Sequence, residues 1–551
     1  MHKNPPADLV LTGGRVATMD ADGRLAEAVA VRSGRIVSVG RARDIETLVG
    51  PRTRRIDLAG RTLLPSFQDA HVHPALAGIN LTRCPLHGLP RRLDAYLDTI
   101  RNYATANPDR AWVLGDGWYM AAFPGGTPSR LDLDAAVPDR PAFFVNRDGH
   151  GAWANSRALT LAGITRDSVD PTDGRIERDS SGDPSGTLHE GAMNLVGRLL
   201  PPVTVEERAR GLLLAQAYLQ RLGIGAWQDA WVTPPDLAAY RLLAERGLLT
   251  ARVIACQWWE RDRGEEQIEE MAELRRTSSI GRLRATTVKI MQDGVAENYT
   301  AAMLEPYIDQ HGRPTDNRGL SFVDPARLKD HVRRLDAAGF QVHFHALGDR
   351  AVREALDAIE AAQVANGPST ARHHLAHLQV VDPTDIPRFR TLGAAANIQP
   401  YWACHDAQMD DLTLPFLPPE RGALQYPFRT IASSGAVLAG GSDWSVSTPN
   451  VMAEIEVAVS RVSPEDRSAP PFLPAEALDL LTALAAFTTG SAWVNHLDQV
   501  TGSIEAGKLA DLVVLDRDIM APGAGPLGDT QVLLTLIDGQ PVYEAATLES
   551  A

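Results

Sequence analysis

The 551-residue chain has little cysteine and no long apolar run, and these two absences exclude several classes of protein. Its cysteines, Cys84, Cys256 and Cys404, are far apart and odd in number, which argues against a disulfide framework or a cysteine-rich zinc site. No stretch approaches the roughly 20 apolar residues that span a bilayer. Residues 1–8 also lack the hydrophobic core of a signal peptide. We therefore expect a cytoplasmic protein that does not bind a membrane.

Basic clusters and two common enzyme motifs are also missing. The formal net charge is -15, and no grouped lysines and arginines are present to neutralise phosphates, so nucleic acid is not an expected partner. Residues 523–528 fit Gly-x-Gly-x-x-Gly, but they follow no βαβ strand and a proline stands where the helix should start, which argues against a dinucleotide site. No Gly-x-Ser-x-Gly elbow occurs, which disfavours a serine hydrolase. A small-molecule substrate remains as the expected partner, and a homodimer is considered as the assembly.

Alternating strand and helix patterns predict an α/β fold built on a parallel (β/α)8, TIM-like barrel. The candidate barrel strands lie near residues 63–70, 222–229, 251–257, 284–291, 339–345, 372–378, 394–399 and 436–442. Amphipathic stretches at residues 205–221, 325–338 and 350–365 fill several of the gaps between them. A bare barrel takes about 250 residues. The chain is therefore long enough for the barrel and further structure.

Short alternating segments at both ends of the chain predict a small β-sandwich made from the N- and C-terminal segments. We expect the N-terminal segments to form antiparallel strands and to pack against the C-terminal segments, because neither set can bury its apolar face alone. The expected domains are residues 1–62 and 497–551 for the sandwich and 63–496 for the barrel. The gap at about 75–205 is too long for one helix and predicts a large insertion after the first barrel strand, over the mouth where barrel enzymes keep their sites.

The apolar segment that begins at Leu64 ends in His71-Val-His73. Because strand side chains alternate between faces, His71 and His73 point the same way and can share one metal ion. Neutral imidazole is the commonest metal ligand. Two solvated or hydrogen-bonded histidines at a strand end remain the alternative.

Lys289 lies in the middle of an apolar strand pattern, where an unpaired ammonium is costly to bury. A lysine amine that adds carbon dioxide becomes a carbamate, an anionic ligand with two oxygens that can bridge two metals. The alternative is an ion pair between Lys289 and Asp293 or another carboxylate.

Two later strand patterns end in histidine and a third ends in aspartate. His343 and His345 share a face, and His345 lies nearer the strand end, so it is the candidate ligand. In the next strand, parity places His373 and His377 on one face and His374 on the other, and His377 is nearest the exit. His343, His373 and His374 are expected to pack or to orient their neighbours.

Asp443 ends the last strand pattern, where a carboxylate can hold a metal and exchange a proton with water. An aspartate that caps a helix N-terminus is the alternative.

The order His-x-His, Lys, His, His, Asp resembles the amidohydrolase superfamily, and within it the YtcJ-like branch, or amidohydrolase 3 family, which includes N-substituted formamide deformylases. The resemblance covers nearly the whole chain. It rests on residues 149–159, on Lys289 with Asp293-Gly294 and Pro306-Tyr307, and on residues 345–349, 441–444 and 502–516. The chain departs from the pattern at Ala376-His377, where relatives usually carry Glu-His.

The resemblance implies a binuclear hydrolase. His71, His73 and Asp443 would hold one divalent metal, His345 and His377 the other, and N6-carboxylated Lys289 would bridge them. Zinc is the first choice for a histidine-rich, oxygen-bridged site without cysteine, while iron, manganese or cobalt would also fit. A single-metal site remains open if Lys289 is not carboxylated. Asp443 is expected to transfer a proton between the attacking water and the leaving nitrogen.

The expected reaction is hydrolysis of a C–N bond in an amide, formamide or carbamate-like small molecule. His150 and Glu190, in matched motifs of the predicted insertion, are the candidates for contact with the substrate carbonyl. Aromatic residues near strand ends, among them Tyr119, Tyr401 and Trp444, favour a substrate with an apolar or aromatic group, although they could also clamp the insertion onto the barrel. A related deaminase, decarboxylase or isomerase, or a non-catalytic binding protein, is the alternative.

Overall fold

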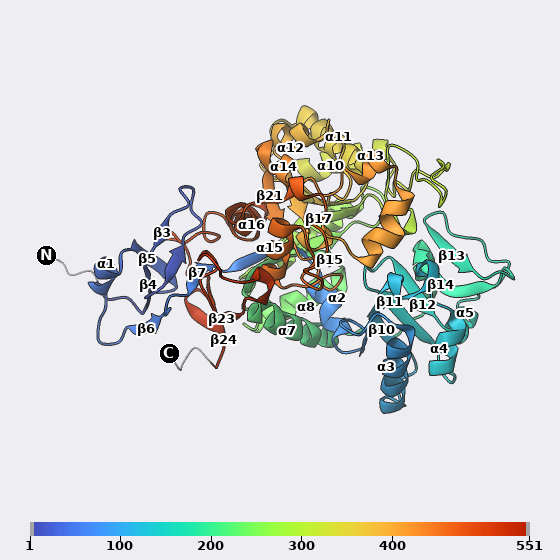
Figure 1. Cartoon of the computed structure of the whole chain (residues 1–551), viewed down its shortest axis with the longest axis horizontal. Helices are drawn as coiled ribbons and strands as arrows, with labels where there is room; N and C mark the ends of the chain where they lie inside the picture. The colour runs from blue at the N-terminus through green and yellow to red at the C-terminus, as the bar shows by residue number, and fades with distance from the viewer. Residues whose placement is uncertain (1–4, 547–551) are drawn as a thin grey trace.

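The computed structural model describes residues 5–546, and its centre is a barrel of eight parallel strands (Figure 1). Along the chain these strands are β8 (Phe67–Val72), β15 (Ile224–Val232), β16 (Arg252–Trp258), β17 (Leu283–Met291), β18 (Gln341–Ala346), β19 (His374–His377), β20 (Ala395–Ile398) and β21 (Val437–Gly440). Each strand is hydrogen-bonded to the one before it in this order. The sequence pattern located all of them, and the predicted fold class is confirmed.

Amphipathic helices cover the outside of the barrel. The longest are α7 (Val205–Arg221), α10 (Pro325–Ala337) and α11 (Asp349–Asn366). α7 begins in a capping box between Thr204 and Glu207, which satisfies backbone groups that the first turn leaves unpaired. α11 buries residues three and four apart, which gives it one apolar face. Among the described residues, no helix is long and apolar enough to cross a membrane.

The first and last barrel strands meet at their carboxyl ends. The N–H of Asp443 donates to the carbonyl of His71, and the N–H of His73 donates to the carbonyl of Trp444, both at 2.7 Å. Asn397 Nδ2 adds a bond of 2.8 Å to the carbonyl of Ala70. Residues more than 300 positions apart in sequence, such as His71 and Asp443, are thereby fixed side by side.

Strands from both ends of the chain form two sheets at one side of the molecule (Figure 1). One sheet has the order β5 (Arg35–Gly40), β4 (Ala28–Arg32), β1 (Leu9–Thr12), β6 (Arg54–Asp57). The other has the order β24 (Gln540–Glu544), β23 (Val532–Ile537), β22 (Leu512–Leu515), β7 (Thr62–Pro65), β2 (Arg15–Ala17), β3 (Leu25–Ala26). Leu11, Val29, Leu63, Val514 and Leu534 belong to one buried core between them.

The sequence pattern suggested antiparallel strands at the chain ends, but the terminal sheets also contain parallel pairs. β1 pairs with β6, and β2 with β7, in parallel. The strands of each pair are separated in sequence by other strands and by helix α1 (Ala42–Glu46), so the chain has room for a crossover and no hairpin turn dictates the direction. The antiparallel expectation for these two pairs was wrong.

The chain between β8 and β15 forms a further sheet beside the barrel, on the side away from the terminal sheets (Figure 1). Its order is β13 (Gly174–Arg178), β14 (Pro184–Glu190), β12 (Gly151–Ala154), β11 (Ala142–Asn146), β10 (Val113–Trp118), β9 (Cys84–Pro85). Trp118, Phe144 and Trp153 are fully buried in its core. The antiparallel pair β12 and β14 brings His150 and Glu190 to one end of this sheet.

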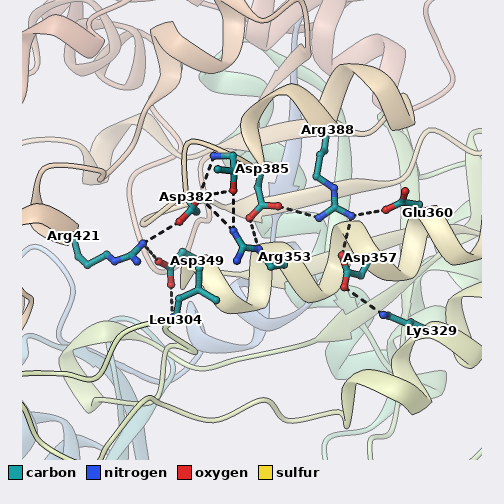
Figure 2. Close-up of polar contacts among 11 residues, drawn as sticks. Leu304, Lys329, Asp349, Arg353, Asp357, Glu360, Asp382, Asp385, Arg388 and Arg421 are labelled. Atoms are coloured by element: carbon teal, nitrogen blue, oxygen red, sulfur yellow. Dashed lines mark hydrogen bonds and ion pairs between the residues drawn. The ribbon is translucent and has the colours of Figure 1, made fainter.

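A chain of ion pairs ties together the helices on one side of the barrel (Figure 2). Its members are Lys329, Asp349, Arg353, Asp357, Glu360, Asp382, Asp385, Arg388 and Arg421. Buried Asp349, at the start of α11, contacts Arg421 and accepts the N–H of Leu304 at 2.7 Å. The network therefore joins the loop after β17 to α11 and to α13 (Pro419–Gly422).

Candidate metal centre

Three predicted ligands converge where β8 and β21 meet. His71 is in β8, His73 follows that strand, and Asp443 follows β21. The Nε2 atoms of His71 and His73 lie 3.2 Å and 2.9 Å from Asp443 Oδ1. Each residue offers one donor atom, and these atoms all lie within 4.8 Å of one another. The structure thus brings together the two histidines and the carboxylate that the sequence assigned to one metal ion.

A buried hydrogen-bonded relay fixes the ring of His71. His343 Nδ1 lies 2.8 Å from Gln228 Oε1, which can only accept, so His343 Nδ1 carries the proton. Burial lowers the pKa of His343 well below its usual range, so this ring is neutral and its Nε2 accepts a hydrogen bond. His71 Nδ1 lies 2.8 Å from His343 Nε2 and therefore donates to it.

The relay directs a lone pair of His71 at Asp443. Burial lowers the pKa of His71 to about 3, so the ring is neutral and its Nε2 has no proton. A lone pair and a carboxylate oxygen 3.2 Å apart repel each other unless a cation lies between them. Outer hydrogen bonds that fix the tautomer in this way are typical of histidine metal ligands. The residues present therefore fit a divalent cation.

Asp293 orients His345 in the same manner. His345 Nδ1 lies 3.1 Å from Asp293 Oδ1. Burial raises the pKa of Asp293 to about 8, but each of its oxygens already accepts from backbone N–H groups, so the shared proton is on His345 Nδ1 and Nε2 is available. Asp293 also accepts the backbone N–H groups of Ala302, Leu347 and Gly348 at distances of 2.9 to 3.1 Å. These hydrogen bonds fix the Asp293 carboxylate, which in turn fixes the orientation of the His345 ring.

His377 points into the site because of its backbone conformation, which the sequence pattern did not predict. Its ring centroid lies 4.7 Å from that of His71, and its Nδ1 lies 3.9 Å from Asp443 Oδ2. His373, assigned to the same face by strand parity, instead contacts Asp336 of helix α10 at 3.1 Å, outside the barrel. The parity argument was wrong because His377 has φ 81. Alternation of faces holds only for extended backbone, and this turn swings the side chain inward.

Lys289 is buried, and no described residue pairs with it. Its residue is 2% exposed, and in the described part of the chain its Nζ has no hydrogen-bond partner and forms no ion pair. The pairing with Asp293 considered from the sequence is therefore not formed. Burial lowers the pKa of Lys289 to about 7, so a large fraction of the amine is neutral at neutral pH.

His150 and Glu190 form an ion pair beside the histidine cluster. His150 Nδ1 lies 2.9 Å from Glu190 Oε2, and Glu190 Oε1 accepts the hydroxyl of Thr300 at 2.7 Å. Burial lowers the pKa of His150, but the charge of Glu190 outweighs it and raises that pKa to about 9. The His150 ring lies 5.5 Å from the His345 ring between centroids. A partly buried cation from the neighbouring sheet therefore lies next to the candidate ligands.

The sequence interpretation missed two residues of the site. Asp69 accepts the backbone N–H groups of His71 and Ser442 at 3.0 and 3.1 Å and the Ser442 hydroxyl at 2.6 Å, which braces β8 against β21. An aspartate within an apolar strand pattern was the available signal. Gln228 also binds His374 Nε2 at 2.8 Å, and nothing in its sequence surroundings marked it.

A family model described as the amidohydrolase family matches residues 54–543. The chain belongs to the amidohydrolase family. The YtcJ amidohydrolase of Bacillus subtilis (strain 168) is 30% identical over 97% of this amidohydrolase and 98% of its own length. The N-substituted formamide deformylase of Arthrobacter pascens is 29% identical over 98% of each chain. The predicted family is confirmed.

Solved structures share the fold of this amidohydrolase. An uncharacterized metal-dependent hydrolase from Pyrococcus horikoshii OT3 has a TM-score of 0.73 and 22% identity, over 94% of this chain and 99% of that one. Family membership supports the prediction that the protein is a hydrolase.

Proposed function

We propose that this amidohydrolase uses divalent metal to cleave a C–N bond of an amide, formamide or carbamate-like small molecule. The observation that carries the proposal is the convergence of His71, His73 and Asp443, with a lone pair and a carboxylate oxygen facing each other at 3.2 Å. Full-length similarity to an N-substituted formamide deformylase supports the choice of bond.

The ligand assignment follows from which donor atoms are available. His71, His73 and Asp443 would hold one ion, and His345 and His377 the second. Zinc suits such a nitrogen and oxygen set. When bound, the ions polarise a substrate carbonyl and lower the pKa of water toward 7.

Lys289 would bridge the two ions as a carbamate. Its neutral amine would attack the carbon of carbon dioxide, so that a C–N bond forms while one C–O π bond opens onto oxygen. The nitrogen would then release one proton to water, which leaves an anion with two oxygens. The lowered pKa of Lys289 supports this step because only the neutral amine reacts. The missing partner of Nζ supports it as well, since the carbamate oxygens would bind the cations.

Two further side chains have roles in the reaction. Asp443, a carboxylate at the end of β21, takes a proton from the attacking water and passes it to the leaving nitrogen. His150 holds its Nδ1 proton toward Glu190 and can direct its Nε2–H at the carbonyl oxygen, where negative charge develops. Glu190 keeps His150 protonated and oriented.

Metal analysis of the purified protein tests the metal requirement. We expect one to two equivalents of a transition metal in the native protein and a large loss in Lys289→Ala, with partial recovery of activity by short carboxylic acids. Lys329→Ala is the matched control, because Lys329 is 44% exposed and pairs with Asp357 on the surface. A native protein without metal, whose stability a chelator does not change, would contradict the proposal.

A substrate panel tests the bond. N-formyl amines, N-acyl amino compounds, carbamates and cyclic amides should be compared by release of amine. Product formation without amine or ammonia would show that another bond is cleaved.

A further inference from the structure

A cavity of about 530 Å³ lies against the loop that follows Asp443, and none of the candidate metal ligands lines it. Trp444 and Ser445, which directly follow Asp443, form part of its wall. Its volume falls within the range of about 300–1,000 Å³ that is typical of small-molecule sites. The cavity is therefore large enough for the part of a substrate that extends beyond the scissile bond.

Aromatic side chains line much of this cavity. They are Tyr96, Tyr119, Tyr218, Tyr401 and Trp444. The rings of Tyr218, from α7, and Trp444 lie 5.2 Å apart between centroids. Tyr119 and Tyr401 come from the loops after β10 and β20. The walls thus suit an apolar or aromatic group.

Arg147 links the cavity to the candidate centre. It follows β11 and lies three positions before His150. Its Nε donates to the carbonyl of Val446 at 2.7 Å, and the N–H of Val446 donates to the carbonyl of Asp443 at 2.7 Å. The guanidinium is therefore fixed to the same loop that holds the proton-transferring carboxylate.

Arg147 is the basic residue of this cavity whose charge is not paired within the described part of the chain. Arg91 pairs with Glu465 at 2.7 Å, and His87 pairs with Asp116 at 2.7 Å. No described carboxylate lies within ion-pairing distance of Arg147, whose guanidinium carbon is 5.4 Å from the centre of the Tyr119 ring. A partly buried guanidinium with free N–H donors is well suited to bind a carboxylate.

We propose that Arg147 binds a carboxylate of the substrate, so that the preferred substrates are N-acyl or N-formyl compounds that carry a carboxylate and an apolar side group. This inference rests on the proposed function. The side group lies among the tyrosines, the carboxylate meets Arg147, and the acyl group reaches the Asp443 side. Glu465 lines the same cavity, so a single negative charge fits better than a phosphate dianion.

Matched substrates test the proposal without any mutation. N-formylphenylalanine and N-formyl-2-phenylethylamine differ only in the carboxylate. We expect kcat/KM to favour the carboxylate by about 10-fold to 100-fold, the factor that a charge-assisted hydrogen bond supplies. Equal rates, or a preference for the neutral compound, would overturn the proposal.

Variants then identify the residue responsible. Arg147→Met should raise KM for the carboxylate substrate far more than for the neutral one, and Arg147→Lys should keep part of the preference. Arg91→Met is the matched control and should keep the preference, because Arg91 is paired with Glu465. A preference that survives in Arg147→Met, or that is lost equally in Arg91→Met, would assign it elsewhere.

A binding measurement separates this proposal from the proposed function. Calorimetry should show that phenylacetate binds the native protein and that Arg147→Met loses this binding at least 10-fold, while phenylacetamide binds less tightly than phenylacetate. If neither substrate is hydrolysed but this pattern holds, the proposed reaction fails and the carboxylate site stands. If phosphate competes with phenylacetate more strongly than acetate does, the carboxylate assignment is wrong.

Discussion

Replacing His343 with phenylalanine should weaken zinc binding, although every candidate metal ligand stays in place. In the native protein, His343 Nε2 accepts from His71 Nδ1–H and His343 Nδ1–H donates to Gln228 Oε1, each at 2.8 Å. Phenylalanine can make neither hydrogen bond. His71 can then move its proton to Nε2, the atom that must be free to bind metal. Loss of such an outer partner typically costs about 10-fold to 100-fold in metal affinity, or about 1.4–2.8 kcal/mol.

His343→Gln should recover much of the affinity. Its amide oxygen can accept from His71, and its amide nitrogen can donate to Gln228. Zinc affinity of the metal-free proteins would be measured by competition with a chromogenic chelator. His373→Gln is the control, since His373 is also buried but contacts Asp336 outside the barrel. Unchanged affinity in His343→Phe, or an equal loss in His373→Gln, would refute the relay.

Two further predictions concern charge. His150 has a pKa raised to about 9 from an ordinary value of 6.5, so its pairing with Glu190 contributes full stability below about pH 6.5 and loses it as pH rises through 9. The alkaline limb of kcat/KM should therefore lie near pH 9 and disappear in His150→Gln; a limb that stays would exclude His150. Arg421→Met should cost about 3 kcal/mol in urea unfolding because it strands buried Asp349, whereas Arg263→Met, at an exposed pair, should cost less than about 1 kcal/mol.

The barrel could be predicted from the sequence because its signal is local. Most of its strands fall in short segments rich in apolar residues, and β15 to β21 are buried over most of their length. The pairing of β1 with β6 and of β2 with β7 could not be predicted, since strand direction depends on how distant segments cross. The domain boundaries at residues 62 and 496 stay a prediction, as does the cytoplasmic location.

Some residues of the candidate site could likewise be predicted from the sequence, and others could not. His71 and His73 were predictable because their two-residue spacing in a strand fixes their common direction. Lys289 was predictable because a charge in an apolar strand is costly. His377 was chosen by its place at the strand end, but its direction comes from a positive φ that no local pattern announces. Gln228 carried no signal at all.

The sequence by itself determined the barrel, the amidohydrolase family and the residue types at the strand ends, because strand periodicity and ligand chemistry act over a few neighbouring residues. Only the tertiary structure decided which of these side chains meet. It placed Asp443 against His71, left Lys289 without a partner among the described residues, and set the His343 proton by a glutamine on another strand. Those contacts join residues more than 100 positions apart in sequence, and their geometry depends on how the whole barrel closes.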